Sequence, residues 1–183
     1  MNIMIVGVGG QGTLLASRIL GKVAIKEGYD VKVSEVHGMS QRGGSVVTYV
    51  KYGDKVYSPI IDRGEADLIL AFEMLEAMRA LPYLKKGGKM IANTQKMNPM
   101  PVITGAMEYP ENIEEKLSAK INLQAVDALS LAEKAGTIKA VNVVLIGLLA
   151  KSMDVDKNVW IDVIKETVPE KFLDVNIKAF ELG

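Results

Sequence analysis

The sequence contains no cysteine and only one histidine, His37. A disulfide, a thiolate nucleophile and a cluster held by cysteine thiolates are therefore excluded within this chain. Because only one imidazole is present, a metal site built from several histidines is excluded as well. Electron transfer through an ordinary iron–sulfur cluster would consequently need a partner protein.

The chain also lacks an excess of either charge, since 22 basic side chains balance 22 acidic ones. This balance gives no electrostatic reason to expect nucleic acid or an anionic membrane as a partner. The longest apolar run, around Val141 to Ala150, is too short to span a bilayer. The segment from Met1 to Val6 lacks the basic and apolar regions of a signal peptide. We expect a cytoplasmic protein.

The first part of the chain predicts an α/β fold. A short β-branched strand at Asn2 to Val6 precedes a glycine-rich turn, a helix at Thr13 to Glu27 and a second strand at Val31 to Val36. This order opens a doubly wound, mostly parallel sheet of the Rossmann-like type. The length of 183 residues fits one domain, which we expect to span residues 1–183.

An antiparallel insertion is expected next. Val46 to Lys51 and Lys55 to Tyr57 flank a Gly-Asp pair and predict a β-hairpin between the parallel units. Further strands are expected at 68–72, 89–92 and 121–126, and helices at 73–81, 112–119, 128–135, 141–151, 155–168 and 172–182. The connection from Thr94 to Pro110 contains three prolines, and connections of this length are usually functional or contact a partner.

Gly7, Gly9 and Gly12 form a G-x-G-x-x-G pattern between the first strand and the first helix. Such glycines allow a tight turn, leave room for a ligand and permit close packing, while the helix start favours an anion. Glu35 stands about where a dinucleotide fold places its ribose-binding acid. Three alternatives stay open: a dinucleotide site, a site for another phosphate or partner group, and turn geometry alone.

A second polar segment, E-V-H-G-M-S-Q-R-G-G-S from Glu35 to Ser45, follows the second strand. Ligands bind at this edge of an open α/β sheet. The Arg42 guanidinium could pair with a carboxylate or phosphate. The simpler interpretation of the segment is an exposed loop of ordinary turn residues. For His37, the simpler interpretation is a structural role.

The motif V-G-V-G-G-Q-G-T at Val6 to Thr13, followed by E-V-H-G-M-S-Q-R-G-G-S-V at Glu35 to Val46, resembles the gamma module of 2-oxoacid:ferredoxin oxidoreductases. The His-Gly-Met-Ser-Gln-Arg-Gly-Gly form is most similar to the indolepyruvate branch. The resemblance continues through A-N-T at Ala92 to Thr94, the proline-rich connection, and N-V-V-L-I-G at Asn142 to Gly147. It covers nearly the whole chain.

The resemblance implies a small subunit that is inactive alone. Its large partner subunit would hold thiamine diphosphate, Mg²⁺ and iron–sulfur clusters, decarboxylate aryl 2-oxoacids to aryl acyl-CoA, and pass electrons to ferredoxin. We find no thiamine-diphosphate motif here, and expect no cofactor, metal or confidently assigned catalytic residue in this chain. The residues expected to bind an anion or coenzyme A are Gly7, Gly9, Gly10, Gln11 and Gly12. Those expected to contact the partner and close its active site are His37, Gly38, Met39, Ser40, Gln41, Arg42, Gly43 and Gly44.

A different class of function remains as the alternative hypothesis. The glycine turn together with Glu35 could belong to a stand-alone NAD(P)-binding protein of the Rossmann type. The two hypotheses differ in a simple respect, because only the second expects the isolated chain to bind a nicotinamide dinucleotide.

Overall fold

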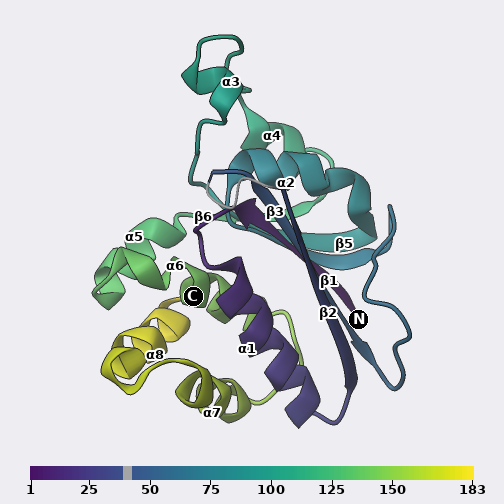
Figure 1. The fold of residues 1–183 in the computed structure, drawn as a ribbon, viewed down its shortest axis with the longest axis vertical. Coiled ribbons are helices and arrows are strands. Elements are labelled where there is room, and N and C mark those ends of the chain that lie inside the picture. The colour runs from purple at the N-terminus through teal and green to yellow at the C-terminus, as the bar shows by residue number, and fades with distance from the viewer. Residues whose placement is uncertain (39–42) are drawn as a thin grey trace.

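A computed structural model describes residues 1–38 and 43–183. Its centre is a six-stranded sheet with the order β2-β3-β1-β4-β5-β6 (Figure 1). The strands are β1 (Asn2–Val8), β2 (Asp30–His37), β3 (Ser45–Gly53), β4 (Ala66–Ala71), β5 (Leu84–Asn93) and β6 (Asn122–Val126).

The sheet is mostly parallel, as predicted. β1, β4, β5 and β6 pair in parallel, whereas β3 pairs antiparallel with both β1 and β2. Within the described residues, β3 is therefore the one strand that runs against the others. Because β2 and β1 flank it, both end at the same edge of the sheet.

The predicted hairpin at Val46 to Tyr57 is wrong. Its first arm is part of β3, but Lys55 to Tyr57 forms no strand. Both hydrogen-bonding edges of β3 are already occupied by β1 and β2, so no edge is left for a returning strand. Instead, the Val56 N–H donates to Asp30 Oδ2 at 2.9 Å, which holds the segment against the start of β2.

Helices cover both faces of the sheet (Figure 1). One face is covered by α1 (Thr13–Lys26), α5 (Ala128–Ala135), α6 (Val141–Ala150), α7 (Lys157–Thr167) and α8 (Leu173–Leu182). The other is covered by α2 (Met74–Ala80) and α4 (Ile113–Ser118). The doubly wound architecture and the C-terminal helices are thus confirmed.

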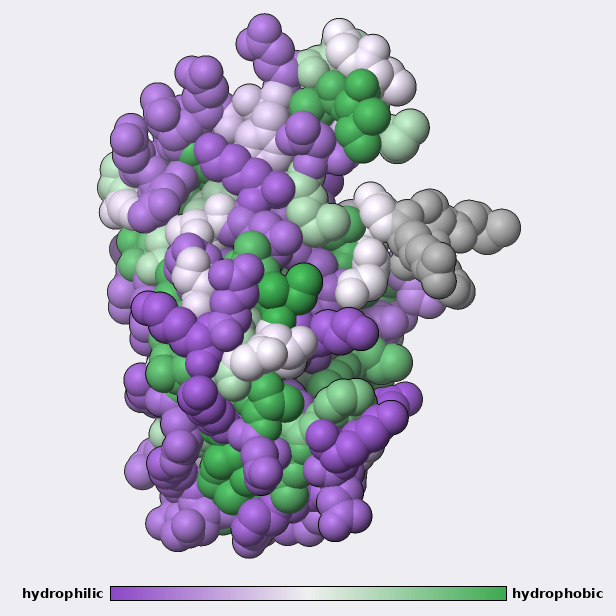
Figure 2. All heavy atoms as spheres, turned by 90° about the vertical axis from the view of Figure 1, so that its left-hand side faces the viewer, coloured by the Kyte–Doolittle hydropathy of each residue, from purple (hydrophilic) through white to green (hydrophobic). Residues whose placement is uncertain are grey.

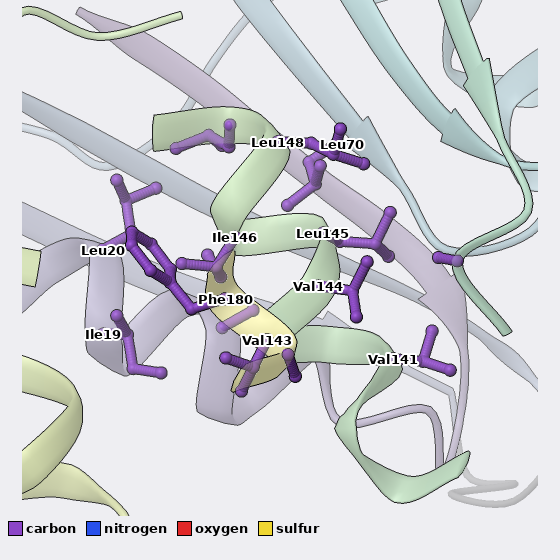
Figure 3. Close-up of a cluster of buried hydrophobic side chains, with 14 of the residues drawn as sticks. Ile19, Leu20, Leu70, Val141, Val143, Val144, Leu145, Ile146, Leu148 and Phe180 are labelled. Carbon is purple, nitrogen blue, oxygen red and sulfur yellow. The ribbon is translucent and has the colours of Figure 1, made fainter. Parts of the chain in front are cut away.

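The larger core lies between the sheet and the C-terminal helices. Figure 3 shows side chains of α6 meeting Ile19 and Leu20 of α1, Leu70 of β4 and Phe180 of α8. The residues of α6 from Val141 to Leu149 are all buried, as its almost entirely apolar sequence predicts.

A smaller core lies on the opposite face of the sheet. Met4 and Val6 of β1 point into it and pack with residues of β4, α2 and α4. Ile3 and Ile5, which alternate with them along β1, point into the larger core. This alternation is the period of two that a strand buried on both faces requires.

The connection between β5 and α4 stands away from the body of the molecule (Figure 1). We call residues 94–110 the arm. The arm contains one short helix, α3 (Met100–Ile103), which the sequence did not predict. Across the described ranges, no helix combines the length and the apolar character that a membrane crossing needs.

Candidate functional site

A cleft lies at the edge of the sheet where β1 and β2 end. Its volume is about 400 Å³. It is lined by Gly9, Gly10, Gly12, Thr13, Leu14, Glu35, His37 and Val46. The structure therefore brings residues of both predicted motifs to one place.

The two glycine-rich segments are joined directly through their backbones. The Gly9 N–H donates to the Gly44 carbonyl at 2.8 Å, and the Gly43 N–H donates to the Gly9 carbonyl at 3.4 Å. From the sequence, we expect Gly9 to leave space for a ligand. In the structure its backbone groups bind the second segment, so the close approach that glycine permits is between two parts of the same chain.

Gln11 holds the glycine turn from inside. Its Oε1 accepts the Val8 N–H at 2.8 Å, and its Nε2 donates to the Phe72 carbonyl at 3.1 Å. The side-chain amide thereby links the end of β1 to the end of β4. This arrangement gives Gln11 a structural role that its place in the motif did not reveal.

Gly7 and Gly12 are both sites of close packing. A Cβ at Gly7 would lie 2.9 Å from Gln11 Oε1 and from the Phe72 Cβ. Gly12 has φ +87°, and a Cβ there would lie 2.6 Å from Nδ2 of Asn142. The close contact at Gly12 is thus with Asn142 in the first turn of α6 and not with the preceding strand β1.

Glu35 and His37 project from the last residues of β2. The Thr48 hydroxyl donates to Glu35 Oε2 at 3.2 Å, which holds the carboxylate beside the cleft. His37 is exposed, and its Nδ1 lies 3.2 Å from the Gly38 carbonyl. The cleft therefore combines a helix start, which favours an anion, with a carboxylate, which disfavours an anion nearby and favours hydroxyl or amine donors.

Four of the expected partner-contacting residues lie outside the described residues: Met39, Ser40, Gln41 and Arg42. Among the described residues, no three His, Cys, Asp or Glu side chains gather in a way that could hold a metal ion. The described part of the cleft therefore offers backbone groups of the glycines and the side chains of Thr13, Glu35 and His37 for binding.

Two buried carboxylates near Ser45 are not among the site residues that the sequence predicts. Glu73 is 1% exposed and Glu76 is 4% exposed. Glu76 accepts the Ser45 hydroxyl at 2.6 Å and the Arg79 guanidinium at 2.5 Å. Glu73 caps α2 by accepting the Glu76 N–H at 2.9 Å. A charged residue placed directly after the buried strand β4 was the available signal.

Glu73 also holds both ends of the arm. Its Oε1 accepts the Met97 N–H at 3.0 Å and the Tyr109 hydroxyl at 2.6 Å. Burial raises the pKa of the Tyr109 phenol, and the hydrogen bond to Glu73 raises this pKa further. A chain of hydrogen bonds thus runs from Ser45, through the start of α2, to the arm.

The comparisons with known proteins agree over the whole chain. The model of the family described as pyruvate ferredoxin/flavodoxin oxidoreductase matches residues 2–183. A relative from Pyrococcus horikoshii, indolepyruvate oxidoreductase subunit IorB, is 47% identical over 188 residues, covering all of this chain and 93% of the relative.

Solved structures share the fold. Pyruvate oxidoreductase subunit PORC from Thermotoga maritima matches with a TM-score of 0.77 and 20% identity, over 99% of this chain and 93% of that chain. The 2-oxoglutarate:ferredoxin oxidoreductase from Magnetococcus marinus, with 2-oxoglutarate, coenzyme A and succinyl-CoA bound, matches with a TM-score of 0.71 and 16% identity. That match covers 99% of this chain and 30% of the other chain. This chain belongs to the pyruvate ferredoxin/flavodoxin oxidoreductase family.

Proposed function

We propose that this chain is the small subunit of an indolepyruvate-type 2-oxoacid:ferredoxin oxidoreductase and is inactive alone. The observation that carries the proposal is the joining of the two family motifs through the backbones of Gly9 and Gly44 at one cleft. Full-length identity of 47% to an indolepyruvate oxidoreductase subunit supports the choice of branch.

The large partner subunit supplies the redox chemistry in this proposal. It holds thiamine diphosphate, Mg²⁺ and iron–sulfur clusters, and it passes electrons from the aryl 2-oxoacid to ferredoxin. A chain without cysteine needs such a partner for cluster-based electron transfer. We place the complex in the cytoplasm, where coenzyme A and ferredoxin are available.

The small subunit contributes binding and closure. We propose that the cleft accepts part of coenzyme A, with an anionic group at the start of α1 and a hydroxyl group near Glu35. The first N–H groups of a helix have no partner within that helix, and they favour an anion. Thr13 and Leu14, the first two residues of α1, line the cleft. His37 and the residues 38–44 that follow it would contact the partner.

Reconstitution tests the assignment. The small chain alone is expected to show no reduction of ferredoxin with indolepyruvate and coenzyme A. Mixing it with the large subunit is expected to restore the activity. Activity of the isolated small chain, or full activity of the large subunit without it, would contradict the assignment.

Leu14 offers a sharp test of the cleft because it is 45% exposed and lines the cleft. Leu14→Asp places a negative charge at the anion site, whereas Leu14→Asn has the same shape without the charge. We expect Leu14→Asp in the reconstituted complex to raise the KM for coenzyme A about tenfold relative to Leu14→Asn. Equal KM values would remove coenzyme A from this cleft and leave the subunit assignment standing.

The stand-alone dinucleotide-binding hypothesis has a separate test. The Glu35 carboxylate in the cleft is the observation that favours it. Titration of the isolated chain with NADH and NADPH, followed by nucleotide fluorescence, is expected to show no binding at micromolar concentrations. Saturable micromolar binding would support this alternative.

A further inference from the structure

The arm carries an uncharged, apolar tip. Residues 97–107 contain no charged side chain, although charged residues make up 24% of the sequence. Met100, Ile103 and Met107 are 65%, 64% and 65% exposed. Figure 2 shows hydrophobic side chains gathered at the top of the molecule, where the arm stands off the body. Single exposed apolar residues are ordinary, but a cluster at a projecting tip indicates a contact surface.

The three apolar residues belong to one compact tip. Met100 and Ile103 stand three residues apart on α3, which places them on the same side of that helix. The Met107 N–H donates to the Pro101 carbonyl at 3.0 Å, which turns the chain back onto α3 after Gly105. Methionine side chains adapt their shape to an opposing apolar surface.

The tip is organised by its own hydrogen bonds and prolines. The N–H groups of Val102 and Ile103 donate to the Pro99 carbonyl, and the Thr104 N–H and hydroxyl both donate to the Met100 carbonyl. A segment that is already ordered loses less conformational entropy when it binds. Exposure of apolar surface and preorganisation together are the properties of a docking element.

The base of the arm is fixed to the body at both ends. Glu73 accepts hydrogen bonds from the Met97 N–H and from the Tyr109 hydroxyl, and it is almost fully buried. Through Glu76, the same network reaches Ser45, which directly follows Gly44. A partner that seats the arm would therefore act on a part of the molecule that is rigidly connected to the cleft.

The fold of this chain also occurs as one part of a longer chain in the Magnetococcus enzyme. In that enzyme the same fold matches 30% of one longer chain, so the module is covalently joined to the rest of that chain. The curated relative from Pyrococcus horikoshii is instead a separate subunit of about the same length as this chain, so a large partner must be held by contacts between chains. An apolar tip that stays exposed on the isolated module is a natural part of that interface.

We propose that the arm is the docking element by which this chain seats itself in an uncharged, apolar groove of the large subunit. The inference rests on the proposed function, because it assumes that a large subunit is the partner. The groove of the large subunit is expected to present apolar side chains to Met100, Ile103 and Met107. A charged or strongly polar surface would lose its hydration there without gaining hydrogen bonds.

Ile103 and Ile25 form a matched pair for the test. Ile103 is 64% exposed in α3, and Ile25 is 61% exposed in the last turn of α1. Figure 1 shows α1 in the lower half of the molecule and α3 at its top. Ile103→Asp is expected to raise the dissociation constant of the small subunit for the large subunit at least tenfold, because a charge is buried at the contact. Ile25→Asp is expected to change it by less than about twofold.

Calorimetric or surface-based binding measurements with the purified large subunit supply the readout. Met100→Asp repeats the test at a second position, and circular dichroism melting of each isolated variant verifies its fold. Tight binding by the unmodified chain and by both arm variants would overturn the inference and leave the proposed function intact. Failure of the unmodified chain to bind would overturn both.

Self-association is the competing explanation, in which a second copy of this chain covers the apolar tip. Sedimentation equilibrium of the isolated chain is expected to show a monomer. A dimer that Ile103→Asp dissociates, with Ile25→Asp having no effect, would assign the tip to self-association and overturn the inference.

Discussion

Two helical glycines should respond in opposite directions to the same substitution. Gly147 lies in α6, where an added Cβ would stand 2.1 Å from the Phe180 carbonyl oxygen and 3.0 Å from its carbon. Gly21 lies in α1, where the nearest atom to an added Cβ is Val33 Cγ2 at 3.6 Å. The first contact is impossible without movement of α8, whereas the second is an ordinary van der Waals contact.

The magnitudes follow from packing and helix propensity. Alanine at Gly147 must push the α8 backbone away by about 1 Å, and overpacking of a well-filled core costs roughly 1–3 kcal/mol. After the gain in helix propensity, we expect Gly147→Ala to lower the free energy of unfolding by about 2 kcal/mol, or roughly 4–8 °C in Tm. Gly21→Ala has no clash to offset the gain and should raise stability by about 0.5–1 kcal/mol.

Urea unfolding followed by circular dichroism, with both variants compared in the same buffer, is the assay. A Gly147→Ala protein as stable as the unmodified protein would show that α6 and α8 do not pack backbone to backbone. Destabilisation by both substitutions to the same extent would show that the effect belongs to glycine itself and would refute the reasoning.

Two further predictions concern the glycine turn and alkaline pH. Gly12→Ala should lower the free energy of unfolding in urea by about 2–3 kcal/mol, because Gly12 combines a positive φ with a close contact to Asn142. Gly10→Ala should lower it by only about 1 kcal/mol, because an added Cβ there has nothing within 4 Å and only backbone strain remains. Equal losses would argue against the Asn142 contact. Burial raises the pKa of Tyr52 from 10.0 to about 12 and also raises the pKa of Tyr109. The folded state thus keeps these protons while the unfolded chain loses them, so their contribution to stability is complete below pH 10 and is lost as the pH rises toward 12. Melting curves between pH 10 and 12 should show a falling Tm, and Tyr52→Phe should make this fall smaller. A Tm that stays constant over this range would contradict the raised tyrosine pKa values.

Most of the fold could be predicted because its signals are local. The strand, turn and helix from Asn2 to Lys26 appear directly in the pattern of apolar residues and glycines. The sequence also predicts the almost entirely apolar α6 and the two amphipathic helices after it. The position of β3 could not be found in this way, because the choice of neighbours for a strand depends on segments far away in the sequence.

The site was predicted in part for the same reason. The two glycine motifs identified the edge of the sheet and placed Glu35 and His37 there. The partners of Gln11 and Glu73 were missed, because Phe72 and Tyr109 lie 61 and 36 residues away. Hydrogen bonds over such separations leave no periodic signature, so a polar residue after a buried strand gave only a weak indication.

The alternation of side chains along β1 has a consequence for how the molecule fluctuates. Ile3 and Ile5 belong to one hydrophobic core, Met4 and Val6 belong to the other, and the sheet separates the two cores. Loosening of α2 and α4 therefore need not disturb the C-terminal helices. We therefore expect amide hydrogen exchange to be faster in α2 and α4, which cover the smaller core, than in α6 and α8, which cover the larger one.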